Sequence, residues 1–204
     1  MSLIKLQEKM GVTADGSFGP ATLKAAMKFF KLTPEAAAHF FGQTAHETGG
    51  FHLFTENLNY SATALQSTFK KYFPGNLAEL YARQPIKIGS RAYANRMGNG
   101  DEASQEGYFF RGRGALQTTG KLNYEAFSES IDKPEIMKTP DLVATDYSFE
   151  AAIFFFNTNK LWTICNKGVN DATILALTKK INGGTNGLGD RSSLTKRYYS
   201  WLKE

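Results

Sequence analysis

The chain has 204 residues, a formal net charge of +5 and a single cysteine. This length can bury a sizeable core, as one domain or as one domain with a small appendage. One cysteine excludes an intramolecular disulfide, and no apolar run approaches the roughly 18 residues of a transmembrane helix, so we expect no stable membrane insertion. The positive charge favours an anionic partner, such as a membrane surface or a cell wall. Because the basic residues are spread along the chain and no nucleic-acid-binding motif is present, we expect no nucleic-acid partner.

The first 32 residues predict two short helices, over residues 3–9 and 20–31. An Asp15-Gly16 turn and a Gly19-Pro20 helix start join them. The characteristic residues of this stretch are Leu6-Gln7, Gly11-Val12, Asp15-Gly16, Phe18-Gly19-Pro20, Thr22, Ala25-Ala26 and Phe29-Phe30. In this pattern the stretch resembles the repeat of the peptidoglycan-binding domains that accompany wall hydrolases. It is shorter than such a three-helix domain, so it either adds wall affinity or only packs on the rest of the chain. We therefore predict a short helical stretch over residues 1–32 and a main domain over residues 33–204.

The next predicted helix runs from about residue 34 to residue 48 and ends in an acid. Thr33 and Pro34 are typical of an N-cap and a first helical residue, and Gly49-Gly50 is typical of a helix stop. At about 100° per residue, Glu47 lies within about 20° of Phe40, on the stripe that should face the interior. Poor solvation and the negative end of the helix dipole would favour its protonated form, which a general acid requires. The alternative is an ordinary helix-end glutamate that turns toward water.

The remaining elements predict a mainly α fold. Residues 149–162 are apolar nearly all round and predict a central buried helix, whereas residues 190–203 predict an amphipathic helix. Strand alternation is scarce. Loops that contain glycine and asparagine, and that would line a cleft, are expected around residues 51–60, 97–120 and 182–190.

A second acid, Glu56, follows nine residues after Glu47 in a polar stretch that predicts loop or extended chain. Glycoside hydrolysis needs one protonated and one ionised carboxyl group. The loop from Arg111 to Thr119 is rich in donors, and its glycines would let the backbone approach a ligand closely. The alternatives are a surface turn with two solvated arginines, or a phosphate loop, although no Gly-Lys-Ser/Thr string follows. The three histidines lack the HExxH spacing and no Cys/His cluster exists, so we expect no metal and no other cofactor.

Five segments of the chain match the motifs of one known family, and they occur in the same order as in that family. They are residues 46–51, 56–61, 93–100, 108–120 and 181–191. Together they resemble glycoside hydrolase family 19, the hydrolases related to plant class I chitinases, in the shorter form found in phage endolysins. The resemblance covers about residues 34 to 204. Plant members pair several cysteines and place their second catalytic glutamate farther along the chain, so Glu56 matches the endolysin branch only.

The resemblance implies a lysozyme-like helical domain with a substrate cleft between two lobes. It implies that Glu47 is the catalytic acid, that Glu56 is the second carboxylate and that Thr119 holds the attacking water. The implied substrate-binding residues are Tyr93, Gln117, Asn123, Asn182 and Arg191. Within this set, Gln117 would lie in the catalytic centre, both asparagines would contact the N-acetyl sugar, and the arginine would help to orient the acids.

We therefore predict an endolysin of the lysozyme (muramidase) type, which hydrolyses the β-1,4 bonds of bacterial peptidoglycan by an inverting mechanism with two carboxylates. A chitinase that acts on β-1,4-linked N-acetylglucosamine with the same acids is the alternative, and a non-catalytic wall-binding module is a third possibility. We expect a monomer whose partner is peptidoglycan. Because the N-terminus lacks the basic-then-apolar pattern of a signal peptide, we expect synthesis in the host cytoplasm and action in the periplasm after holin-mediated release.

Overall fold

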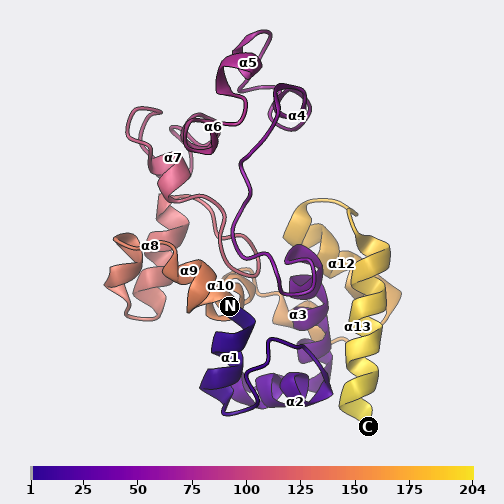
Figure 1. The fold of residues 1–204 in the computed structure, drawn as a ribbon. Coiled ribbons are helices and arrows are strands. Elements are labelled where there is room, and N and C mark those ends of the chain that lie inside the picture. Colours follow the sequence, from indigo (N-terminus) through magenta and orange to yellow (C-terminus); the bar gives the residue numbers. More distant parts are fainter. Residues whose placement is uncertain (1) are drawn as a thin grey trace. The chain divides into compact units, whose positions relative to one another are not determined.

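Helices provide almost all of the regular structure in the computed structural model, which describes residues 2–204. The bridges between extended segments in this range are isolated ones, from Thr55 to Arg113 and from Arg113 to Thr118. The predicted mainly α fold is therefore confirmed. The helices belong to two compact units, and Figure 1 labels most of them.

The first unit is discontinuous in sequence. It combines the chain up to Phe54 with Gly114–Leu116 and Ala144–Glu204. Its helices are α1 (Ser2–Met10), α2 (Pro20–Phe29), α3 (Pro34–Glu47), α10 (Ser148–Thr158), α11 (Trp162–Cys165), α12 (Asp171–Asn182) and α13 (Leu188–Lys203). Helices α3 and α13 run side by side and form the main helix pair of this unit (Figure 1).

A cluster of aromatic side chains fills the core of the first unit. Phe41 of α3 is fully buried, and its ring centroid lies 5.1 Å from that of Phe18 and 6.0 Å from that of Phe149. The same buried cluster includes residues of the first two helices, namely Leu3, Leu6, Leu23 and Ala26. Helices α1 and α2 thus share a core with α3. The boundary between residues 32 and 33 stays a prediction.

The buried side chain of Gln7 holds the turn that joins α1 to α2. Its Nε2 donates to Asp15 Oδ1 and to the Ser17 carbonyl, each at 3.0 Å. Its Oε1 accepts from the Gly16 backbone N–H at 2.8 Å. Gly16 has a φ of +74°, a conformation that glycine adopts without strain. The Gln7 amide therefore fixes the predicted Asp15-Gly16 turn.

The predicted single helix over residues 149–162 is wrong. Helix α10 ends at Thr158, and α11 begins at Trp162. Asparagine and threonine at positions 157–159 are poor helix formers, and Lys160 takes a left-handed φ of +54°, which interrupts the helix. The predicted helix over residues 190–203 is confirmed, and it begins two residues earlier, at Leu188.

The second unit comprises Thr55–Arg113 and Gln117–Val143. Its elements are α4 (Ala62–Thr68), α5 (Leu77–Tyr81), α6 (Pro85–Ala92), α7 (Glu106–Phe109), α8 (Lys121–Ser130) and the 3-10 helix η1 (Pro134–Met137), and α9 (Leu142–Thr145) spans its end. Its own small core consists of Leu58, Leu65, Phe73, Ala78, Ile88 and Ala92. Because α7 lies inside the predicted loop over residues 97–120, that segment is partly helical.

One histidine is locked inside the first unit. His39 of α3 is fully buried, and its Nε2 lies 3.1 Å from the Gly168 carbonyl, so Nε2 carries the proton and donates. Its Nδ1 has no hydrogen-bond partner within residues 2–204. Burial lowers the pKa of His39 below its ordinary value of 6.5, because a charged imidazolium would lose its hydration.

We therefore expect the free energy of unfolding to fall as the pH drops below about 6.5. In that range the unfolded chain takes up a proton at His39 while the folded chain resists it, so acid favours unfolding. Urea unfolding at pH 7.5 and 5.5 would measure the loss. In His39→Gln the amide can still donate to the Gly168 carbonyl but does not titrate, so the loss should be smaller. An equal loss in both proteins would contradict this account.

Candidate active site

The sequence signals around α3 place Glu47 as predicted, at the end of that helix. Thr33 is the N-cap, and its side chain accepts from the Ala36 N–H at 3.2 Å. Helix α3 ends at Glu47, and Gly49 and Gly50 follow with φ values of +57° and +78°. These glycines stop the helix because L side chains avoid that conformation. The carboxyl group thus stands on the last turn of a helix whose body is buried.

The Glu47 carboxylate is paired with an arginine from the other end of the chain. Arg191, from the first turn of α13, donates to Glu47 Oε1 and is only 2% exposed, whereas the Glu47 side chain is 23% exposed. The second terminal nitrogen of Arg191 donates to Gln43 Oε1 at 2.6 Å, and its Nε donates to the Asn186 carbonyl at 3.1 Å. The structure therefore brings together two of the predicted site residues, Glu47 and Arg191.

Gln43 is a site residue that the sequence interpretation missed. It is fully buried one helical turn before Glu47, and its Nε2 donates to Thr178 Oγ1 at 3.2 Å. Its two polar groups thus link α12 to Arg191. The spacing of four residues from Glu47 was the only available sign, because residues four apart share a helix face.

The residues next to this pair in sequence form a second link between the same helices. His46 Nδ1 lies 2.6 Å from Asp190 Oδ2. A Cβ built on Gly187 would overlap the His46 ring, so only glycine fits there. The His46 ring thereby fixes the turn that precedes α13 and supports the position of Arg191.

Asn182, the last residue of α12, uses its amide to hold this turn. Its Nδ2 donates to the Asn186 carbonyl at 2.8 Å, and its Oδ1 accepts from the Gly184 N–H at 2.7 Å. The geometry makes Asn182 a support of the loop that leads to Arg191. Its contact with an N-acetyl sugar stays a prediction.

Glu56 belongs to the second unit and has a different environment. Its Oε1 accepts from the Tyr93 hydroxyl at 2.6 Å, and its Oε2 accepts from the Gly112 N–H at 3.1 Å. The Glu56 N–H in turn donates to the Gly112 carbonyl at 2.8 Å. Both oxygens thus have donors while the side chain stays partly exposed. This arrangement suits an ionised carboxylate.

The Tyr93 phenol acts as a donor to Glu56. Burial raises the pKa of Tyr93 well above its ordinary value, and the negative charge of Glu56 and their hydrogen bond raise it further. Burial and the same charge also raise the pKa of Tyr60. Both phenols therefore stay protonated near neutral pH. The structure thus brings Tyr93 together with Glu56.

Three predicted site residues lie close to Gly112. A Cβ at this position would lie 2.6 Å from Gln117 Oε1, 3.2 Å from Thr119 Oγ1 and 3.3 Å from Glu56 Cβ. Any larger residue would push these side chains apart. Thr119 Oγ1 donates to the Gln117 carbonyl at 2.8 Å, and Asn123 Nδ2 donates to the Thr119 carbonyl at 2.7 Å. The predicted grouping of Glu56, Gln117 and Thr119 therefore exists within the second unit.

The alternative of a surface turn with two solvated arginines does not hold for Arg113. This side chain is 2% exposed, and its Nε donates to Asp141 Oδ1 at 2.7 Å. One terminal nitrogen donates to the Phe109 carbonyl at 2.8 Å and to the Tyr124 hydroxyl at 3.1 Å. Arg113 is thus an internal brace of the loop that carries Gln117 and Thr119. The sequence offers no signal for this role, because its carboxylate partner is 28 residues away.

Within residues 2–204, no group of three or more His, Cys, Asp or Glu side chains could hold a metal ion. No helix in that range combines the length and apolar character needed to cross a bilayer. Cys165 is buried, and burial raises the pKa of its thiol to about 12, so the thiol stays protonated.

Comparisons with known proteins agree on one family. Residues 30–169 match the family model of glycoside hydrolase family 19, described as chitinase class I. A glycosyl hydrolase family 19 domain-containing protein of Haemophilus influenzae is 42% identical over 159 residues, which are 77% of this chain and 75% of that protein. An acidic 27 kDa endochitinase of Solanum lycopersicum is 33% identical over 123 residues, which are 59% of this chain and 36% of that protein.

The fold has a counterpart among solved structures. The crystal structure of a bacterial family 19 chitinase aligns with 98% of this chain and 94% of its own, with a TM-score of 0.51 and 18% identity. The helical fold and the family-model match over more than half of the sequence both indicate the same family. The chain belongs to glycoside hydrolase family 19, and it is a glycosidase.

Proposed function

We propose that this glycosidase is an endolysin of the lysozyme type, which hydrolyses β-1,4 bonds of bacterial peptidoglycan. The observation that carries the choice of polymer is the N-terminal pair of helices. Their sequence resembles a peptidoglycan-binding repeat, and they are built into the core that also holds the helix of Glu47. An enzyme whose wall-binding element shares a core with its acid helix would stay close to the wall while it cuts.

We propose that Glu47 protonates the glycosidic oxygen. This role requires Glu47 to carry a proton when substrate is bound. Arg191 also bonds Gln43 and the Asn186 carbonyl, so it can keep its place when Glu47 turns toward the substrate. The arginine would then stabilise the carboxylate that remains after proton transfer.

We propose that Glu56 is the general base and that Thr119 positions the water that it activates. Tyr93 and the Gly112 N–H hold the Glu56 carboxylate, and Thr119 Oγ1 lies on the same side of Gly112. The two carboxyl groups belong to different units, so the proposal requires the substrate to bring both to one bond. An inverting mechanism needs them roughly 6.5 to 9.5 Å apart, which leaves room for the water.

Chitin is the second candidate substrate. The names of the plant relatives favour it, because four of them are called endochitinases. Chitin and peptidoglycan share β-1,4-linked N-acetylglucosamine units, so the same two acids serve either polymer. The choice depends on contacts outside the catalytic residues.

A paired measurement separates these candidates. Turbidity of outer-membrane-stripped bacterial cells is recorded beside the cleavage of a soluble chitin oligomer. We expect the cells to clear and the oligomer to be cut far more slowly. Cleavage of the oligomer alone would make the protein a chitinase, and binding to the wall without cleavage of either substrate would leave a binding module. Mass spectrometry of the digested wall would identify which glycosidic bond is cut.

We further propose that a basic surface of α1 and α2 adds affinity for the wall. A depression of about 510 Å³ is lined by Lys9, Met10, Ala21, Lys24, Ala25, Lys28 and Phe29. Lys9 is paired with Glu150, whereas Lys24 and Lys28 make no ion pair within residues 2–204. Like charges four apart on a helix repel each other, so an anionic polymer would relieve this repulsion.

Reversal of both charges, in Lys24→Glu with Lys28→Glu, should weaken binding to insoluble peptidoglycan severalfold without a change in melting temperature. The matched control reverses Lys160 and Lys167, which are exposed basic residues of the same unit. A co-sedimentation assay measures the bound fraction at several salt concentrations. Equal binding by both double variants would leave α1 and α2 with a packing role only.

A further inference from the structure

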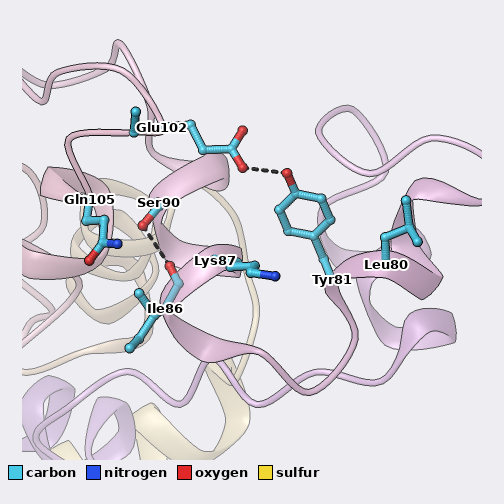
Figure 2. Close-up of a pocket in the computed structure, with 8 residues that line it drawn as sticks. Leu80, Tyr81, Ile86, Lys87, Ser90, Glu102 and Gln105 are labelled. Atoms are coloured by element: carbon cyan, nitrogen blue, oxygen red, sulfur yellow. Dashed lines mark hydrogen bonds between the residues drawn. The ribbon is translucent and has the colours of Figure 1, made fainter.

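A pocket of about 490 Å³ lies on the second unit and includes none of the proposed catalytic residues. Figure 2 shows its walls: residues of α5 face residues of α6, and the segment before α7 adds Glu102 and Gln105. The walls carry both apolar and polar groups, and each kind of group indicates which chemical groups a ligand of this pocket would have.

Two large apolar side chains stand exposed at this pocket. Leu80 is 67% exposed and Ile86 is 47% exposed, which places both among the large hydrophobic residues that the fold leaves uncovered. Single exposed leucines are common on protein surfaces, but two at the same pocket indicate an apolar ligand group. The pocket is therefore suited to a partner that carries short apolar side chains.

Among the described residues that line the pocket, Lys87 is the one cation, and the other polar groups leave its charge unpaired. Glu102 is neutralised, because its Oε1 accepts from the Tyr81 hydroxyl at 2.5 Å and its Oε2 accepts from Arg91 at 2.8 Å. Lys87 makes no ion pair within residues 2–204, and its side chain points from α6 toward Tyr81 (Figure 2). The exposed amide of Gln105 adds a donor and an acceptor on a backbone with φ of +58°. A carboxylate beside Lys87 would complete this set of charges.

We propose that this pocket binds the short peptide that branches from the peptidoglycan strand. Lys87 would pair with a carboxylate of the peptide, and Leu80 and Ile86 would contact its alanine methyl groups. This inference rests on the proposed function and deepens it, because chitin has neither the peptide nor its carboxylates. The pocket would thus supply the preference for peptidoglycan that the two acids do not provide.

Helix α6 connects the pocket to the proposed base. Ile86 and Lys87 lie in its first turn, and Tyr93, which holds Glu56, caps its other end. Six residues of helix span roughly 9 Å along the axis, so the pocket is at a fixed, short distance from Tyr93. A peptide that branches from a sugar near Glu56 would have to extend over only that distance.

The test compares two substrates with the same sugars. One is purified peptidoglycan, and the other is the same material after an amidase has removed its peptides. For the full chain, the ratio of kcat/KM on peptide-bearing strands to kcat/KM on stripped strands should exceed one. Lys87→Gln should lower this ratio about tenfold, the effect of one lost charge-assisted hydrogen bond, whereas Lys87→Arg should keep most of it. The control Lys138→Gln, an exposed lysine of the same unit, should keep the parental ratio.

A second measurement does not depend on cleavage. NMR titration of the full chain with the free stem peptide should shift the backbone amides of Ile86, Lys87 and Gln105. An unchanged ratio in Lys87→Gln, together with no shift at these amides, would overturn the inference while hydrolysis of the wall stands. Shifts at the pocket without cleavage of either strand would refute the proposed function and leave the pocket as a peptide site.

Discussion

Glu47→Gln is expected to lower the rate of glycan hydrolysis by at least about 100-fold, the lower end for the loss of a general acid. The amide keeps the size of the side chain and can still accept from Arg191, but it has no proton to give to the glycosidic oxygen. The variant should fold, because α3 retains its N-cap at Thr33 and its buried face. Release of reducing ends from peptidoglycan and from a chitin oligomer measures the rate on both candidate substrates.

The companion variants separate the roles of the two acids. Glu56→Gln should be comparably severe, because an amide cannot take the proton of the attacking water. Thr119→Ala should be milder, since Gln117 and other neighbours can hold a displaced water in part. Proton NMR of fresh products should show inversion at the anomeric carbon. Retention of the β anomer, or a near-parental rate for Glu47→Gln, would show that the proposed roles are wrong.

Gly42→Ala should produce a large loss of stability in the first unit. A Cβ at Gly42 of α3 would lie 2.9 Å from both Cα and N of Thr195 on α13, and it would also overlap the Thr195 hydroxyl. Backbone atoms cannot step aside, so the two helices must move apart. Overpacking of this kind costs about 3 kcal/mol, and the better helix propensity of alanine returns about 1 kcal/mol. We therefore expect a net loss of about 2 kcal/mol, or roughly 4 to 8 °C in Tm.

Gly42→Ala should also lower activity, because it disturbs the contacts of the proposed active site. Thr195 follows Arg191 by one helical turn, and Gly42 precedes Gln43, so separation of α3 from α13 lengthens the contacts of Arg191 with Gln43 and Glu47. Activity should fall even at temperatures where the variant stays folded. Gly189→Ala is the matched control, because it lies in α13 and a Cβ there meets no atom within 4 Å. Calorimetry that found both variants equally stable would contradict the predicted close approach.

The α3 region shows why part of this fold can be predicted from sequence. Thr33, Pro34 and the two glycines after Thr48 act through their own backbones, so local chemistry sets both ends of the helix. The break after Thr158 was missed because hydrophobic periodicity takes no account of the left-handed conformation at Lys160. The family resemblance predicted several residues of the site. They lie around Gly112 and in the ion pair of Glu47.

The supports of the site were less accessible to prediction. The roles of Gln43, Arg113 and Asp141 come from partners that tertiary structure brings close. A buried arginine is rare enough that a solvated one is the sensible expectation from sequence. The candidate catalytic residues could therefore be named in advance, whereas the residues that hold them in place could not.

The discontinuity of the first unit has a consequence for how such chains can change length. The second unit is an insertion that leaves the first after Phe54 and returns before Ala144, apart from the short return at Gly114–Leu116. The entropy cost of closing an inserted segment grows only with the logarithm of its length. A doubling of that length adds about 0.6 kcal/mol. Surface loops of the inserted unit are thus natural places for relatives to gain or lose segments, while the helices that hold Glu47 and Arg191 keep their pairing.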